Sequence, residues 1–407
     1  MSENVPKVPV GTVAAHKGLI GGPFGSSLGK KDYVSSGIPV VRGQNLSGPG
    51  RFRPADFVYV SREKAFGELS RNLACPGDVV FTQRGTLGQV GLIPDDADDV
   101  YVISQSQMRL RVDPTKADAL YIYYCFRDPE MVARIQSRAI VTGVPHINLA
   151  ILGELPIPLP PLVKQRAIAE VLGALDDKIE ASRRVADSCD ALWQTVAAEV
   201  FDDIEDGQVA SGDFQPLSSL ADFVNGKAFT KNATGTGRMV VRIAELNSGP
   251  GASTIYNEIE VPAEHTATPG DLLFAWSGSL TVQRWYRPEA IINQHIFKVV
   301  PRSKIPMWCV HAHLLRLLPA FQRIAAGKAT TMGHIQRHDL DVEVGVPNGD
   351  MLARLDRVCA PLWHRALRAE KETLVLARLR DALLSKLVSG ELQVRGDDIA
   401  ALMEVSG

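Results

Sequence analysis

The sequence predicts an α/β fold with two similar domains in tandem, each followed by a long helix, and with the two helices packed on each other. Three observations lead to this prediction. The chain has 407 residues of ordinary globular composition, 45% hydrophobic and 22% charged, and is too long for one compact core. Sequence patterns of the first half recur in the second half. Each half ends on a helix-length stretch whose apolar residues lie three and four positions apart.

The recurring patterns follow the same order in both halves, with the second copy about 190 residues after the first. The matched pairs are Val40–Ser47 with Val240–Asn247, Pro76–Phe81 with Pro269–Phe274, Arg84–Leu87 with Ser277–Leu280, Ile103–Gln105 with Ile292–Gln294, and Thr142–Asn148 with Thr330–Gln336. A shared order at similar offsets indicates a tandem duplication.

The two α/β domains are expected at residues 1–155 and 214–348. In the first domain, short apolar runs between glycines and prolines predict strands at Ile38–Val41, Val79–Thr82, Gly91–Ile93, Val100–Ile103 and Met108–Val112. A helical stretch is expected at Ala117–Arg138. The proline-rich segment Leu155–Pro161 that follows favours an extended backbone.

Long helices are expected at residues 156–201 and 349–390. Their apolar seams consist of Ile168, Leu172, Leu175, Ile179, Ser182, Ala186, Cys189, Trp193, Val196 and Val200 in the first helix, and of Leu352, Leu355, Cys359, Leu362, Ala366, Ala369, Leu376, Leu379, Leu383 and Leu387 in the second. This is the spacing of a coiled coil, and two such seams in one chain can bury each other. The acidic stretch 202–213 is expected to be a linker, and residues 391–407 a peripheral tail.

Composition gives only broad limits on function. The formal net charge of −2 does not by itself support nucleic-acid binding, although basic residues outnumber acidic ones within Ser26–Arg62. The five cysteines form no CxxC pair, which favours buried thiols over disulfides or a zinc site. Neither a membrane-spanning apolar run nor a secretion signal is recognisable, so we expect a cytoplasmic protein.

The motifs of an enzyme that acts on DNA are missing. No NPPY- or DPPY-like run, strand-linked GxGxxG, phosphate loop or HExxH is present. Asp176–Lys178 resembles part of a nuclease metal site but falls within the first long helix, so a solvated helix face is expected. His311 and His313 are two positions apart in a helical stretch and do not share a face, which favours a structural role over metal binding. We therefore expect no catalytic residues, no metal and no cofactor on this chain.

Polar side chains suited to reading DNA are concentrated in the loops between the predicted strands. In the first half the candidates are Ser26, Ser27, Lys30, Lys31, Arg42, Gln44, Asn45, Gln83, Arg84, Thr86, Gln105, Gln107, Thr142, His146 and Asn148. In the second half they are Lys227, Lys231, Asn232, Arg242, Ser277, Ser279, Arg284, Gln294, His295, Lys328, Thr331, His334 and Gln336. Arg42 and Arg242 recur in both halves, so we expect them to brace the scaffold or to bind phosphate rather than to read different bases.

These motifs resemble the specificity subunits of type I restriction-modification systems. The resemblance rests on Gly22–Leu28, Asp32–Asn45, Pro76–Phe81, Leu155–Pro161 followed by Gln165–Ile168, and Lys386–Leu392, and it extends over nearly the whole chain. The second half departs from the family pattern: Asn225–Phe229 replaces the fuller opening motif, and the proline segment is reduced to Val344–Pro347.

The resemblance implies two α/β target-recognition domains separated by an antiparallel two-helix coiled coil, with internal pseudo-twofold symmetry. Each domain would read half of a bipartite double-stranded DNA site, and the helices would set the length of the unread spacer. The implied partners are two methyltransferase subunits that carry S-adenosylmethionine, together with endonuclease subunits in a restricting complex. Two other functions are weighed against this one: a single-chain DNA methyltransferase or nuclease, and a helical interaction scaffold with no role on DNA.

Overall fold

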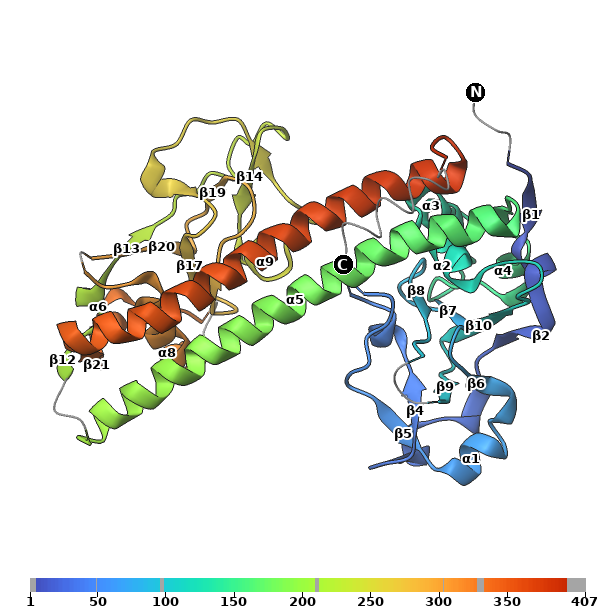
Figure 1. The fold of residues 1–407 in the computed structure, drawn as a ribbon, viewed down its shortest axis with the longest axis horizontal. Coiled ribbons are helices and arrows are strands. Elements are labelled where there is room, and N and C mark those ends of the chain that lie inside the picture. The colour runs from blue at the N-terminus through green and yellow to red at the C-terminus, as the bar shows by residue number, and fades with distance from the viewer. Residues whose placement is uncertain are drawn as a thin grey trace. The chain divides into compact units, whose positions relative to one another are not determined.

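The computed structural model describes residues 5–48, 50–95, 99–208, 212–302, 304–327 and 333–393. The chain divides into two compact units (Figure 1). Unit 1 consists of residues 1–180 and 376–407, and unit 2 of residues 181–375. Each unit therefore combines one α/β domain with a stretch of both long helices, whereas each helix was expected to be a separate whole element.

Unit 1 contains two main sheets. The first has the antiparallel order β2 (Ala14–Gly21), β10 (Gln107–Val112), β7 (Val79–Thr82) and β8 (Val90–Leu92). The second has the order β3 (Tyr33–Val34), β5 (Val58–Val60), β4 (Ile38–Val41), β9 (Tyr101–Ile103) and β6 (Leu73–Ala74), in which β4 and β9 are parallel. All five strands that the sequence predicted are present, with ends that differ by at most one residue.

Unit 2 repeats this topology, but its described strands include no counterpart of β3. Its antiparallel sheet has the order β13 (Ala221–Asn225), β20 (Ile296–Pro301), β17 (Leu272–Ala275) and β18 (Thr281–Arg284). Its second sheet has the order β15 (Tyr256–Asn257), β14 (Arg238–Val241), β19 (Ala290–Ile292) and β16 (Thr266–Ala267), in which β14 and β19 are parallel. The same pairing pattern in both units confirms the duplication that the sequence predicted.

Shorter helices complete the two domains. The α-helices are α1 (Arg62–Phe66), α2 (Ala119–Arg127), α3 (Pro129–Ser137) and α4 (Leu149–Gly153) in unit 1, and α6 (Leu217–Leu220), α7 (Ile243–Ser248) and α8 (Met307–Gly327) in unit 2. The 3-10 helices are η1 (Val10–Val13), η2 (Gly25–Ser27), η3 (Lys30–Asp32), η4 (Gly43–Asn45), η5 (Ser70–Asn72), η6 (Ala263–His265) and η7 (Arg337–Asp341).

The helical stretch expected at Ala117–Arg138 is two helices rather than one. Asp128 has an extended backbone and ends α2, because a residue that precedes proline is disfavoured in the helical conformation. Pro129 then occupies the first position of α3, where its missing N–H has no intrahelical partner to lose.

The proline segments are extended, as predicted, and both are strands. β11 (Pro156–Pro158) pairs with β1 (Lys7–Pro9), and β21 (Glu343–Pro347) pairs with β12 (Gly212–Pro216). The segment expected as a linker at 202–213 is shorter than predicted. Helix α5 occupies it up to Glu205, and β12 starts at Gly212.

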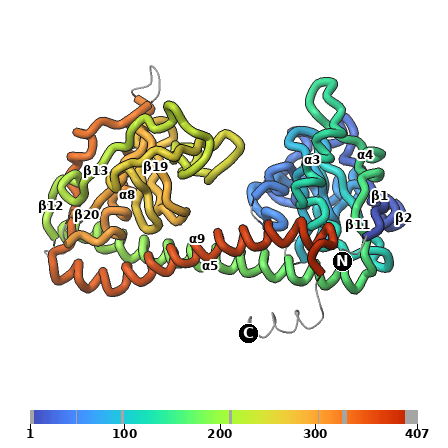
Figure 2. The backbone as a smooth tube through the Cα atoms, turned by 90° about the horizontal axis from the view of Figure 1, so that it is seen from above, coloured from blue at the N-terminus to red at the C-terminus, as the bar shows by residue number. Residues whose placement is uncertain are grey.

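Helices α5 (Leu162–Glu205) and α9 (Gly349–Ser389) run in opposite directions within each unit (Figures 1 and 2). In unit 1, Ile168 and Leu172 share a buried cluster with Leu387. In unit 2, Ala186 and Cys189 pack with Ala366 and Ala369, while Trp193 and Phe201 pack with Cys359 and Leu352. Most of the predicted seam is therefore buried, and the antiparallel pairing is confirmed within each unit.

One seam position was predicted wrongly. Leu379 is 46% exposed, and Arg380 is buried in its place. The reason is a carboxylate on the facing helix: Asp176 accepts a hydrogen bond from Arg380 at 2.7 Å. No helix within the described residues is long and apolar enough to cross a membrane.

Candidate nucleic-acid interface

Two loops meet at the same place in each unit. In unit 1, the N–H of Ile147 donates to the carbonyl of Gln83 at 3.0 Å, and the N–H of Gly85 donates to the carbonyl of Pro145 at 3.3 Å. The corresponding bonds in unit 2 run from Ile335 to Trp276 at 3.0 Å and from Gly278 to Gly333 at 2.8 Å.

The isolated bridges Arg84–His146 in unit 1 and Ser277–His334 in unit 2 lie at the same junction. The sequence matches between Arg84–Leu87 and Ser277–Leu280, and between the two histidine loops, are thus structural equivalences.

The junction in unit 1 borders two open hollows. The larger hollow, about 1120 Å³, is lined by five predicted residues, namely Ser27, Gln83, Arg84, Gln105 and Asn148. The smaller hollow, about 380 Å³, is lined by Gln44, Arg84, Thr86 and Gln107. Arg84 borders both hollows, its side chain is exposed, and no hydrogen bond or ion pair ties that side chain within the described residues. Most of the loops chosen from the sequence therefore converge on one surface of unit 1.

The larger hollow is also lined by residues that were not predicted from the sequence, chiefly Lys17, Phe24 and Arg71. Lys17 lies within β2, where the pairing with β10 is irregular and its φ of 54° is in the left-handed region, and Arg71 lies in η5. Neither belongs to a motif that recurs in the second half, so the repeat gave no signal for them. Phe24 belongs to the Gly22–Leu28 motif, but a phenyl ring has none of the hydrogen-bonding groups on which the predicted DNA contacts were based.

Asn45 was predicted to contact DNA, but its side chain stabilises the surrounding loop instead. It is fully buried, and its Oδ1 accepts from the N–H of Arg42 at 2.9 Å, while its Nδ2 donates to the carbonyls of Arg53 and Ala55 at 3.0 and 2.9 Å. Asn45 thereby satisfies backbone groups that would otherwise be unpaired beneath the loop.

Gln107 is corrected in the same way. It is 1% exposed, and its Oε1 accepts from the hydroxyl of Ser104. The exposed Gln105 uses its amide to hold a neighbouring loop, since its Nε2 donates to the carbonyls of Gly25 and Leu28, each at 2.5 Å. Asn148 caps α4 by accepting from the N–H of Ile151 at 2.8 Å.

Arg42 and Arg242 brace equivalent turns. Arg42 Nη2 donates to the carbonyl of Asp56 at 2.6 Å. Arg242 Nη2 lies 2.6 Å from Glu245 Oε1 and also donates to the carbonyl of Ser253 at 2.7 Å. Burial alone would raise the pKa of Glu245, but its hydrogen bonds with Arg242 lower that pKa below the ordinary value and keep the carboxylate charged. Both arginines thus make scaffold contacts, the first of the two roles expected for them.

The remaining predicted residues of unit 1 differ in exposure. Ser26, Lys30, Lys31 and Thr142 are exposed, while Gln44 and His146 are half-buried. Gln44 Nε2 donates to the carbonyl of Asp56 at 2.7 Å, so its amide nitrogen has a partner inside the protein.

Arg284 is corrected from a DNA contact to a structural anchor. It lies at the end of β18 with 4% exposure, and it forms ion pairs with Asp190 at 2.9 Å and with Glu370 at 2.8 Å. Its guanidinium also lies over the ring of Trp363, 4.9 Å from the ring centroid. Burial opposes the charge, but the two carboxylates raise the pKa of Arg284 above its ordinary value. The sequence showed a basic residue after a strand but not the two helices that face it.

Ser277 is also corrected, because it is 2% exposed and its hydroxyl lies 3.0 Å from Nδ1 of His295. The other described candidates of unit 2 are accessible to different degrees. Lys227, Lys231, Asn232, Ser279 and Gln336 are exposed, and Gln294, His295 and His334 are half-buried. The predicted contacts Lys328 and Thr331 lie outside the described residues.

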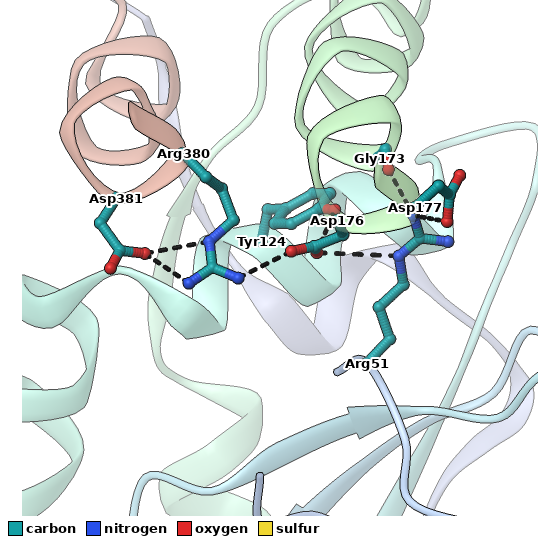
Figure 3. Close-up of polar contacts among 7 residues, drawn as sticks. All are labelled: Arg51, Tyr124, Gly173, Asp176, Asp177, Arg380 and Asp381. Carbon is teal, nitrogen blue, oxygen red and sulfur yellow. Dashed lines mark hydrogen bonds and ion pairs between the residues drawn. The ribbon is translucent and has the colours of Figure 1, made fainter. Parts of the chain in front are cut away.

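Asp176 is a buried structural group, whereas a solvated helix face was predicted for Asp176–Lys178. Figure 3 shows its carboxylate between Tyr124, whose hydroxyl donates at 2.7 Å, and Arg380 at 2.7 Å. Arg51 lies on the other side, with its Nε 3.8 Å from Asp176 and its Nη2 2.7 Å from the exposed Asp177. Burial together with the negative Asp176 raises the pKa of Tyr124, so the phenol remains a donor.

His311 and His313 occupy different environments within α8, as their spacing predicted. His311 Nδ1 accepts from the indole N–H of Trp363 at 3.2 Å, and the ring of His313 stacks on Phe201 with centroids 4.0 Å apart. Burial lowers the pKa of each to about 3, so both rings are neutral. Their contacts support the structural role that the sequence favoured.

Comparison with known proteins gives one consistent result. Residues 30–186 match the family of the type I restriction modification DNA specificity domain. The chain is 22% identical over 421 residues to the type I restriction enzyme MjaIX specificity subunit of Methanocaldococcus jannaschii, a match that covers 93% of this chain and 92% of that protein. It is 26% identical over 191 residues to the type I restriction enzyme EcoBI specificity subunit of Escherichia coli, covering 45% of this chain and 40% of that protein.

The crystal structure of the type I restriction-modification system S subunit from M. genitalium has the same fold. Its TM-score is 0.61 at 17% sequence identity, with 95% of this chain and 97% of that chain covered.

Proposed function

We propose that this chain is the DNA-reading, non-catalytic specificity subunit of a type I restriction-modification system, and that each of its two units reads one half of a bipartite target. The observation that carries this proposal is the loop junction built twice, at Arg84–His146 and at Ser277–His334. The two copies share their backbone bonds but differ in the side chains that they expose, since the exposed Arg84 of unit 1 corresponds to the buried Ser277 of unit 2. Equivalent loops with different side chains suit two different half-sites.

We also propose that the chain directs associated adenine-methyltransferase subunits to this target, with S-adenosylmethionine held by the methyltransferase. Two such subunits per chain, and endonuclease subunits in a restricting assembly, complete the proposed cytoplasmic complex. Support comes from exposed apolar side chains on the long helices: Val163 and Leu379 in unit 1, and Leu192, Val358 and Val375 in unit 2. These side chains are available to contact another protein along the helices.

The test is to express the chain together with a type I methyltransferase subunit encoded beside it, and to map modified adenines by single-molecule sequencing. We expect a motif of two short sequences separated by a gap. The matched control expresses the methyltransferase alone and should leave that motif unmodified.

Two outcomes would contradict the proposal. If both proteins are soluble and associated but no motif is modified, the chain is an interaction scaffold with no role on DNA. If the isolated chain binds S-adenosylmethionine and methylates DNA, it is an enzyme in its own right.

A further inference from the structure

Phe24 is the most exposed large apolar side chain among the described residues, at 92% exposure. It lines the larger hollow of unit 1, in a loop that joins β2 to η2. A phenyl ring held in water loses the free energy that burial would give it, so an exposed ring at a binding surface suggests contact with a partner.

The loop is built to hold the ring outward. Before Phe24, Gly22 lies so close to Ser104 that a Cβ would overlap the Ser104 carbonyl oxygen, and Pro23 is buried. After Phe24, Gly25 has a φ of 52°, in the left-handed region that favours glycine. The Gln105 amide donates to the carbonyls of Gly25 and Leu28, and the side chain of Leu28 is buried. Both ends of the loop are thus anchored, and the exposure of Phe24 follows from its conformation.

The surroundings of the ring favour DNA as its partner. Lys17, Arg71 and Arg84 line the same hollow and suit the phosphate backbone. The one acidic residue in the lining, Glu68, is paired with Lys64 at 2.9 Å. A hollow with excess positive charge and one protruding apolar ring matches proteins that insert an apolar wedge between base pairs.

The described residues of unit 2 show no such ring in the equivalent loop. The N–H of Gly22 donates to the carbonyl of Gln107 at 2.8 Å, and that of Gly226 donates to the carbonyl of Ile296 at 3.0 Å, so the two loops are equivalent. The aromatic residue of the second loop, Phe229, is half-buried, and its ring lies 5.8 Å from that of His265. Within the part of the chain that the structure describes, a ring protrudes from this loop in unit 1 and not from its counterpart in unit 2.

We propose that Phe24 inserts between adjacent base pairs of the half-site read by unit 1 and unstacks that step. The proposal rests on the proposed DNA-reading function and adds a local distortion in one half-site only. Truncation of the ring removes a base–aromatic contact, for which we expect binding to weaken about 5- to 150-fold.

The test uses the complex of the full chain with its methyltransferase subunit and duplexes that carry the mapped target. 2-Aminopurine is placed at successive positions of both half-sites, because its fluorescence rises when it is unstacked. With the wild-type chain we expect a rise at one step of the unit 1 half-site that Phe24→Ala abolishes, with weaker binding, while signals in the unit 2 half-site do not change. Phe66→Ala is the matched control, since Phe66 is 47% exposed in the same unit but does not line the hollow.

The outcomes separate this inference from the proposed function. Specific binding with equal affinity and equal fluorescence for wild type and Phe24→Ala would contradict the insertion of Phe24 and leave the DNA-reading function standing. Loss of methyltransferase association in Phe24→Ala, with DNA binding unchanged, would make the ring a protein contact and also overturn the wedge. If the wild-type complex shows no specific binding, both the proposed DNA-reading function and the proposed insertion of Phe24 are contradicted.

Discussion

At the scale of single residues, Arg84 is the side chain best placed to contact DNA. It is exposed, it borders both hollows of unit 1, and it has no partner within the described residues. We expect Arg84→Ala to weaken target binding about 5- to 150-fold if the guanidinium reads a base, with relaxed specificity at one position of the unit 1 half-site. If it binds phosphate, binding weakens for all sequences and the salt dependence becomes shallower.

The measurement is methyltransferase-complex binding to target and single-substituted duplexes at several salt concentrations. Arg62→Ala is the control, because Arg62 is equally an exposed arginine of unit 1 but lies outside both hollows. Equal affinities for Arg84→Ala, Arg62→Ala and wild type would remove Arg84 from the interface.

At the scale of elements, the pairing of α5 with α9 in unit 1 includes a buried ion pair. Asp176 and Arg380 have side-chain exposures of 7% and 10% and are 2.7 Å apart. Asp176→Ala leaves Arg380 buried with the exposed Asp381 as its remaining ion-pair partner, so we expect a loss of about 3 kcal/mol in the local free energy of unfolding, the lower end of the cost of breaking a buried pair. Asp177→Ala removes an exposed partner of Arg51 and should cost less than about 1 kcal/mol.

Hydrogen exchange of the α5 amides around Asp176 in the full chain measures both changes. The double variant Asp176→Leu, Arg380→Leu should recover much of the loss, because it removes both buried charges. Equal protection in Asp176→Ala and Asp177→Ala would show that the buried pair does not hold the two helices together.

The long helices and the loops show which structural features sequence patterns can predict. Periodicity predicts both long helices. The repeat predicts that the loop after β7 in unit 1 and the loop after β17 in unit 2 have equivalent neighbours, namely the loops that carry His146 and His334. Residue type alone cannot distinguish a side chain that contacts DNA from one that stabilises the protein. The amide of Asn45 and the guanidinium of Arg284 suit DNA and protein acceptors equally. Their roles depend on partners remote in sequence, such as Asp190 and Glu370 for Arg284.

At the scale of the whole molecule, both long helices continue from one unit into the other. The division falls between Glu180 and Ala181 in α5 and between Val375 and Leu376 in α9, so residues inserted there leave the contacts within each unit intact. Four residues at both places lengthen each helix by about 6 Å, close to one turn. If the helices set the spacer, mapping of modified adenines should return the same two half-sites with a gap about two base pairs longer.

The control inserts four residues in α9 alone. The two helices then differ in length, so the seam pairs that unit 1 and unit 2 each require cannot all form, and methylation of any gapped target should fall. A double insertion that keeps full activity on the original gap would show that the spacer is set elsewhere than in the helices. A double insertion that changes a half-site would show that the units do not read DNA independently.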